Sequence, residues 1–66
     1  MNWDAVKGQW KQMKGEMRKQ WGKLTDDDYQ QIAGEKDKLI GKLQERYGWS
    51  RQEAERSADE YFATRS

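Results

Sequence analysis

The chain has 66 residues, of which 33% are hydrophobic and 38% are charged, and its formal net charge is +1. A chain of this length forms one domain at most and buries only about 60% of its unfolded surface, so we expect a small core and marginal stability. The absence of Cys and His excludes disulfides, the usual zinc and haem sites and most nucleophile–base pairs, so no cofactor is expected. The absence of any long apolar run predicts a cytoplasmic protein without a membrane span or a signal peptide.

Apolar residues repeat at helical spacing over the first third of the chain. At 100° per residue they fall within an arc of about 80°; they are Trp3, Val6, Trp10, Met13, Met17 and Trp21. This stripe predicts one amphipathic helix over residues 3–21. Gly22 follows it, and we expect this glycine to end the helix in a left-handed conformation.

The stretch LTDDDY then has the pattern of a second helix start. Thr25 is suited to cap the helix, and Asp28 completes a capping box. Leu24 and Tyr29 occupy the positions of a hydrophobic staple. The rival interpretation is a Mg²⁺ or Ca²⁺ site on the three aspartates, but three consecutive helical residues point in different directions and cannot all converge on one ion.

A second apolar set follows and ends at Gly48. Its members are Tyr29, Ile32, Leu39, Ile40, Leu43 and Tyr47. Ser50 and Glu53 repeat the capping-box pattern and predict a last helix over about 51–63. The apolar residues of this last helix are Ala54, Ala58, Tyr61 and Phe62.

All six glycines lie on two ladders of seven-residue spacing, at 8, 15 and 22 and at 34, 41 and 48. A shift of 26 positions superposes the two ladders and also superposes much of the apolar pattern, which indicates a duplicated helical hairpin. We therefore predict an all-α domain of four short helices arranged as two crossed hairpins, 3–34 and 35–63. If residues 26–47 form one continuous helix, the arrangement has three helices instead; Gly34 favours the break.

Charge is distributed unevenly. Residues 1–23 carry six Lys or Arg against two acids, a local charge of +4, and residues 24–66 carry seven against ten, a local charge of −3. Either the two parts neutralise each other within the fold, or the basic part binds an acidic partner.

Four basic residues form a candidate surface row beside the Trp stripe, namely Lys7, Lys11, Lys14 and Arg18. Such a row is suited to nucleic-acid phosphates, with Trp10 or Trp3 stacking on bases, or to anionic lipid. The alternative is that Trp10 belongs to the core and the basic side chains extend along its edge. Trp3 and Trp49 are candidate exposed anchors for a protein partner, the alternative being a staple or core-edge role.

Three blocks in order, KGQWKQMKG, WGKLTDDDY and GKLQERYG, resemble the CsbD-like family of small bacterial proteins, and the resemblance extends from Met1 to about Phe62. Trp3 stands where the family more often has a polar residue. The resemblance implies a general-stress-response protein with a helical fold and no established biochemical activity, and it supplies no catalytic residues.

An enzymatic role is not expected, because the sequence places the carboxylates on solvated helix faces. So short a chain also has little room for a water-excluding cleft. We expect a monomeric, non-enzymatic stress protein of unknown partner that protects through hydrophilic bulk. The alternative is an interaction module whose basic first helix binds an acidic protein, a nucleic acid or an anionic membrane surface.

Overall fold

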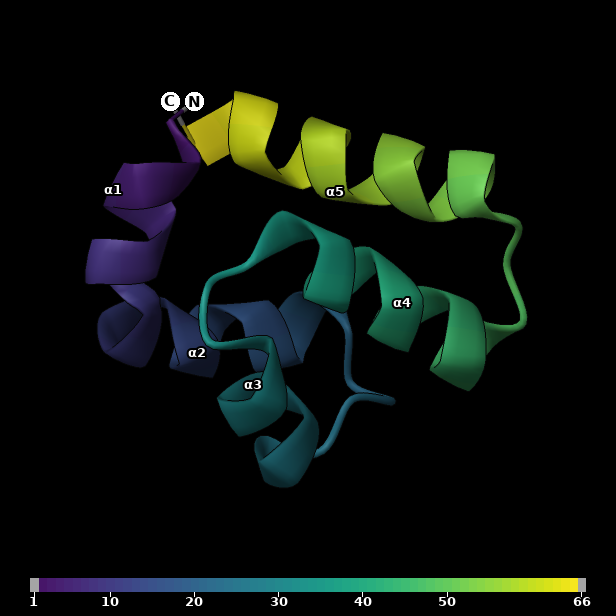
Figure 1. The fold of residues 1–66 in the computed structure, drawn as a ribbon, viewed down its shortest axis with the longest axis horizontal. Coiled ribbons are helices and arrows are strands. Elements are labelled where there is room, and N and C mark those ends of the chain that lie inside the picture. Colours follow the sequence, from purple (N-terminus) through teal and green to yellow (C-terminus); the bar gives the residue numbers. More distant parts are fainter. Residues whose placement is uncertain (1, 66) are drawn as a thin grey trace.

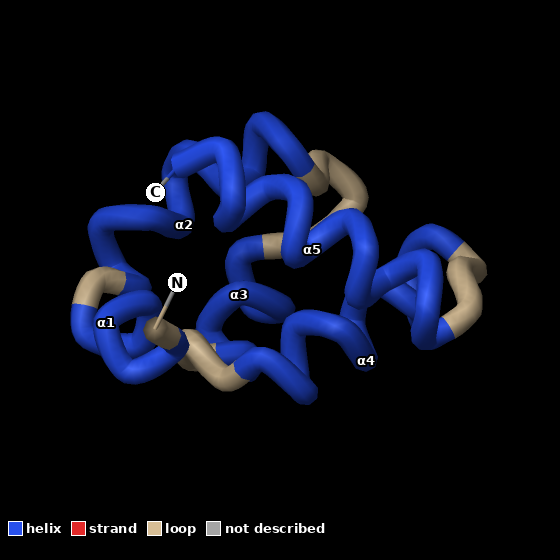
Figure 2. The backbone as a smooth tube through the Cα atoms, turned by 90° about the horizontal axis from the view of Figure 1, so that it is seen from above, coloured by secondary structure: helices blue, strands red, loops and turns tan. Residues whose placement is uncertain are grey.

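The computed structural model describes residues 2–65, with the backbone alone for Arg65, and these residues form five helices without a strand (Figure 1). The helices are α1 (Trp3–Gly8), α2 (Trp10–Gln20), α3 (Asp26–Ile32), α4 (Lys36–Tyr47) and α5 (Arg51–Arg65). The prediction of an all-α fold is confirmed. Helices α1 and α5 bring the two ends of the described chain to the same end of the molecule (Figures 1 and 2).

The single helix predicted over 3–21 is wrong, because the chain bends at Gln9 and forms α1 and α2 instead. Gly8 precedes the bend, and glycine is the poorest ordinary helix former. The bend loses few hydrogen bonds, since the Gln9 N–H still donates to the Ala5 and Val6 carbonyls at 3.1 and 3.2 Å. It turns α1 across the end of α2 (Figure 1).

The expected left-handed Gly22 is also wrong. Positive φ angles occur among the described glycines at Gly34 and Gly48 only. Helix α2 ends at Gln20, its C-cap residue Trp21 has φ −124° and ψ 74°, and the Trp21 side chain is buried in the core. Burial of this indole therefore turns the chain at a point where local sequence suggested a glycine cap.

Helix α3 begins and ends with well-defined caps. The predicted capping box is present: Thr25 Oγ1 accepts the Asp28 N–H at 3.1 Å, and the Thr25 N–H donates to Asp28 Oδ2 at 3.0 Å. The helix ends at two left-handed residues, Ala33 (φ 50°) and Gly34 (φ 81°). The break at Gly34 is confirmed, so residues 26–47 are two helices.

Gly34 also has a packing role. A Cβ atom at this position would lie 2.5 Å from the Lys7 Cα atom, so α1 approaches the α3–α4 turn at backbone distance. No side chain larger than hydrogen fits there without displacing one of the two segments.

Helices α4 and α5 form an antiparallel hairpin, side by side in Figure 1. Gly48 ends α4, as predicted, and it does so in the left-handed conformation (φ 71°). The Ser50 N–H donates to Glu53 Oε1 at 3.0 Å and Ser50 Oγ accepts the Glu53 N–H at 3.1 Å, which confirms the second capping box. The predicted series of helix, glycine, apolar residue, hydroxyl cap and helix thus occurs as α2 followed by α3 and as α4 followed by α5.

Fourteen buried hydrophobic residues from all five helices and the α2–α3 loop form one core. They are Val6, Trp10, Met13, Met17, Trp21, Leu24, Tyr29, Ile32, Leu39, Ile40, Leu43, Ala54, Ala58 and Phe62. Most of the predicted apolar stripe is here, and Tyr47 and Tyr61 are half-buried at its edge. The molecule exposes 4361 Å², close to the ~4400 Å² expected of a folded monomer of this mass.

Candidate functional site

Asp28 is the one buried charged residue among those described, with 1% of its surface exposed. Arg46 donates to its carboxylate through Nε at 2.9 Å and through Nη2 at 3.1 Å, and Lys42 Nζ lies 3.3 Å from Oδ1. The Arg46 hydrogen bonds, with help from the Thr25 N–H and Lys42, outweigh desolvation and hold the pKa of Asp28 well below its ordinary value. This ion pair joins the start of α3 to the last turns of α4.

The three consecutive aspartates have three different surroundings. Asp26 pairs with Arg18 at 2.8 Å, Asp27 accepts from Gln31 Nε2 at 2.9 Å, and Asp28 turns inward to Arg46. The carboxylates therefore do not converge, and the described residues contain no group of three His, Cys, Asp or Glu that could hold a metal ion.

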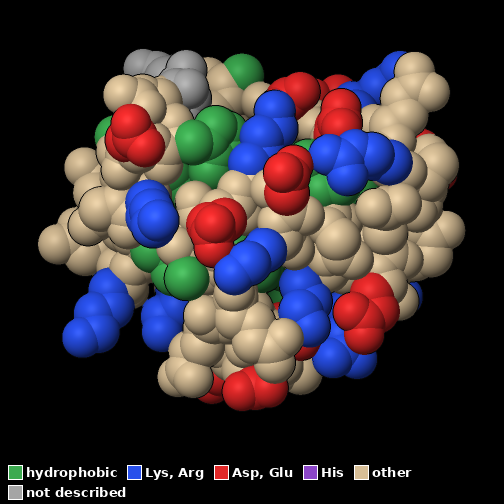
Figure 3. Space-filling view, viewed as in Figure 1, with side chains coloured by type: hydrophobic (Ala, Val, Ile, Leu, Met, Phe, Trp, Pro, Cys, Tyr) green, Lys and Arg blue, Asp and Glu red, His purple; other side chains and the backbone are tan. Residues whose placement is uncertain are grey.

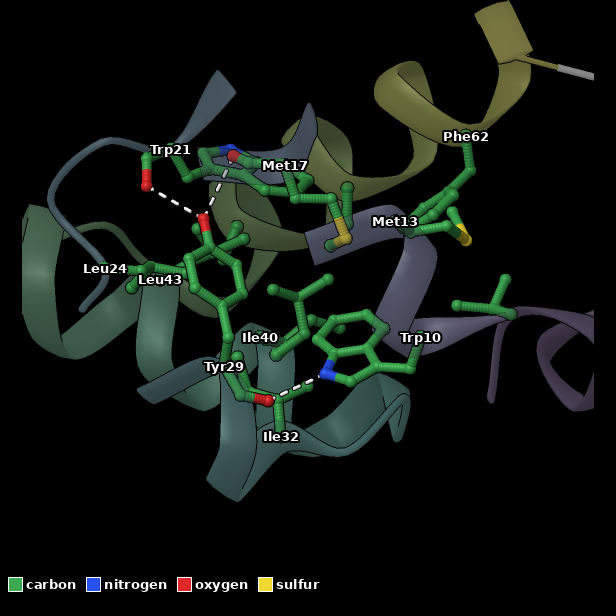
Figure 4. Packing of buried hydrophobic residues seen from close by; sticks show 14 residues of the cluster. Trp10, Met13, Met17, Trp21, Leu24, Tyr29, Ile32, Ile40, Leu43 and Phe62 are labelled. Atoms are coloured by element: carbon green, nitrogen blue, oxygen red, sulfur yellow. Dashed lines mark hydrogen bonds between the residues drawn. The ribbon is translucent and has the colours of Figure 1, made fainter. Parts of the chain in front are cut away.

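A polar network inside the core uses the hydrogen-bonding groups of the buried aromatics (Figure 4). Trp10 Nε1 donates to the Tyr29 carbonyl at 2.7 Å, and the Tyr29 hydroxyl lies 3.0 and 2.9 Å from the carbonyl oxygens of Met17 and Trp21 at the end of α2. Burial raises the pKa of the Tyr29 phenol. The alternative that places Trp10 in the core is confirmed, and its ring is not available to stack on bases.

The bend at Gln9 divides the candidate basic row between two helices. Lys7 lies on α1 beside Gly34, whereas Lys11, Lys14 and Arg18 lie on α2. We define the basic face of α2 by the residues on one arc of about 140° at 100° per residue: Lys11, Lys14, Gly15, Arg18 and Lys19. Lys14 is half-buried at the edge of this arc, and the other four residues are exposed. Within that arc the helix carries Lys, Arg and Gly alone.

The ion pairs do not connect the two parts of the chain evenly. Of eight ion-pair contacts between described side chains, seven lie within residues 24–66. The remaining one, Arg18 to Asp26, links the basic part to the acidic part. Among the described residues, direct ion pairs between the two parts are therefore limited to Arg18–Asp26. Lys7 contributes further, since it adds to the larger effect of Lys38 in lowering the pKa of Glu35. In Figure 3 blue and red side chains alternate over α4 and α5, whereas blue side chains project without red neighbours near the junction of α1 and α2.

The two candidate anchors are half-buried. Trp3 packs edge-on against Phe62 with ring centroids 4.9 Å apart. Trp49 stacks on Tyr47 at 4.5 Å, and Lys23 Nζ lies 5.1 Å from the centre of the Tyr47 ring. Each Trp also lines a surface hollow, of about 230 Å³ and 290 Å³ respectively. Their role as anchors for a partner stays a prediction.

Sequence reasoning missed Arg46 and Lys42. Asp28 was interpreted as a local capping residue, and the distant cations that also bind it lie 14 and 18 residues later in GKLQERYG. This ion pair therefore joins two of the three blocks that carry the family resemblance, WGKLTDDDY and GKLQERYG.

No helix in the described part of the chain combines the length and the apolar character needed to cross a lipid bilayer.

Comparisons with known proteins give a consistent result. The CsbD-like family model matches residues 4–56. The UPF0337 protein YjbJ of Escherichia coli O6:H1 is 52% identical over 92% of this chain and 88% of its own, and a UPF0337 protein of Pseudomonas aeruginosa is 51% identical over 92% and 94%. YjbJ of Salmonella typhimurium is 57% identical over 85% and 80%. These names indicate no enzymatic family. No solved structure matches the chain. The chain belongs to the CsbD-like family.

Proposed function

We propose that this protein is a non-enzymatic stress-response protein of the cytoplasm that protects other macromolecules through its hydrated, charged surface. The observation that carries the proposal is the contrast between a closed interior and a surface that exposes most charged side chains. Asp28, Trp10 and Trp21 are buried. Their polar side-chain groups bind other parts of the chain: Arg46, the Tyr29 carbonyl and Ser57 Oγ. These three buried side chains are therefore not presented to a substrate.

A surface of this kind acts by abundance. Charged residues make up 38% of the chain, and dense mixed charge favours solubility and keeps neighbouring surfaces apart. The family resemblance supports a role in stress, and a protective mechanism needs neither a cofactor nor a defined cleft.

The test is the survival of a labile client enzyme through freeze–thaw or drying, at equal masses of this protein and of albumin. We expect the client to keep more activity with this protein. A G15A/G41A variant is the matched control, because it keeps every surface charge while stiffening two helices, and it should protect equally. Equal survival with albumin would contradict the proposal.

A second candidate is an interaction module that uses the basic face of α2. It is favoured by the distribution of ion pairs, in which Lys11, Lys14 and Lys19 have no acidic partner among the described residues. An acidic partner would neutralise cations that the fold itself leaves unpaired.

A further inference from the structure

We infer that the basic face of α2 binds the phosphate backbone of a nucleic-acid duplex without reading its sequence. This inference rests on the second candidate function and gives its acidic partner a chemical identity.

Charge is the first argument. Lys11, Lys14 and Lys19 make no ion pair with a described residue, and no acid interrupts the face. Arg18 has a partner, Asp26, but both side chains are largely exposed, at 55% and 70%. An exposed pair of this kind is weak, so a phosphate can replace the Asp26 carboxylate. The face therefore offers four cations to a polyanion.

Shape is the second argument. Gly15 lies within the face, midway along its length, and nothing lies within 4 Å of where its Cβ would be. A bare position among long basic side chains lets the helix backbone come close to a ligand. Helix α2 has 11 residues and is therefore about 16 Å long, whereas a duplex carries one negative charge per ~1.7 Å of its axis. The helix can thus meet several phosphates at once.

The composition of the face distinguishes a duplex from other anions. Proteins that bind single strands stack bases on exposed aromatic rings, but Trp10 is buried and its indole N–H is already donated to the Tyr29 carbonyl. Helices that bind membranes insert an apolar face into the lipid, but the apolar residues of α2, including Met13 and Met17, are buried in the core. Contact with regularly spaced phosphates requires neither feature.

The experiment is a fluorescence-anisotropy titration of a labelled duplex at low salt, with single strands of both sequences and anionic vesicles as parallel probes. Four phosphate contacts predict a slope of about −3.6 for log K against log salt, which corresponds to a loss of about 150-fold in affinity between about 50 and 200 mM salt. We expect the duplex to bind more tightly than either single strand or vesicles.

Two triple variants with the same change in net charge locate the site. K11Q/K14Q/K19Q should reduce the slope to about −1 and abolish measurable binding. K36Q/K38Q/R56Q removes three cations from α4 and α5, where Lys36 and Lys38 pair with Asp59 and Glu35, and should bind within about twofold of wild type because it leaves the face intact. Circular dichroism confirms that both variants remain helical.

The inference is overturned if wild type does not bind the duplex at tens of micromolar, if both triple variants lose binding equally, or if single strands or vesicles bind more tightly. The same K11Q/K14Q/K19Q variant in the client-enzyme assay separates the two functions. If the variant loses duplex binding but still protects the client enzyme, the protective proposal stands. If it loses protection but still binds the duplex, the duplex interface stands.

Discussion

Asp28 is the residue at which local and long-range structure meet. One oxygen of its carboxylate accepts the Thr25 N–H within the capping box and the same oxygen accepts from Arg46 Nε, 18 residues away. The second oxygen accepts from Arg46 Nη2 and lies near Lys42. A buried carboxylate with several charge-assisted hydrogen bonds is stable only while all its partners stay in place.

We expect D28N to lower the free energy of unfolding by about 2 kcal/mol and R46Q to lower it by more, because each leaves the other group without its main partner. The loss for R46Q is the larger, since it leaves the carboxylate buried, whereas Arg46 is partly exposed and can be hydrated. Urea unfolding of the two single variants and of D28N/R46Q gives the interaction free energy between Asp28 and Arg46. The double variant should lose distinctly less than the sum.

E35Q is the matched control for the Asp28 cycle. Glu35 pairs with Lys38 at 2.8 Å, but both side chains are largely exposed, so the loss should be a small fraction of the loss from D28N. If E35Q lowered the free energy of unfolding as much as D28N does, the buried Asp28–Arg46 pair would not be more stabilising than an exposed one.

At the level of the helices, the glycines have different roles. Gly15 and Gly41 lie in the middle of α2 and α4, 26 positions apart, and a Cβ at either would meet nothing within 4 Å. Gly34 and Gly48 end helices with positive φ, and Gly34 also touches Lys7. Close packing against Lys7 explains the glycine at position 34. No contact within the chain requires glycine at positions 15 and 41. The proposed ligand contact at the basic face of α2 would give a reason for Gly15.

We expect G15A and G41A each to stabilise the protein by about 0.5 to 1 kcal/mol, because alanine loses less backbone entropy in a helix and meets no obstruction. G34A should destabilise it by about 2 kcal/mol, since alanine there is strained at positive φ and its Cβ collides with Lys7. Thermal unfolding of the three variants checks the signs. Stabilisation by G34A would show that α1 can move away from the turn without loss.

For the whole molecule, the Asp28 ion pair predicts how stability depends on pH. Its pKa is lowered in the folded state from an ordinary value of 3.8, so the folded protein releases this proton more readily than the unfolded chain does. The stabilisation is therefore complete above that ordinary value and is lost as the pH falls below it.

Urea midpoints measured from about pH 7 down to pH 3 should fall at the acidic end. In D28N the fall should be distinctly shallower, because the main group whose pKa differs between the two states has been removed. E35Q provides the comparison for an exposed carboxylate. Parallel curves for wild type and D28N would indicate that other carboxylates dominate acid unfolding.

The sequence alone determined the helical class, both capping boxes, the end of α4 at Gly48 and most of the core, because these depend on spacing and on contacts within a few residues. It indicated the internal repeat and the break at Gly34 for the same reason. Tertiary structure decided the bend at Gln9, the end of α2 before the buried Trp21 and the Asp28–Arg46 pair, since each depends on which distant surfaces pack together. It also decided that Lys11, Lys14 and Lys19 pair with no described acid whereas Arg18 pairs with Asp26, because periodicity places a charge on a helix face but only packing determines what that face meets.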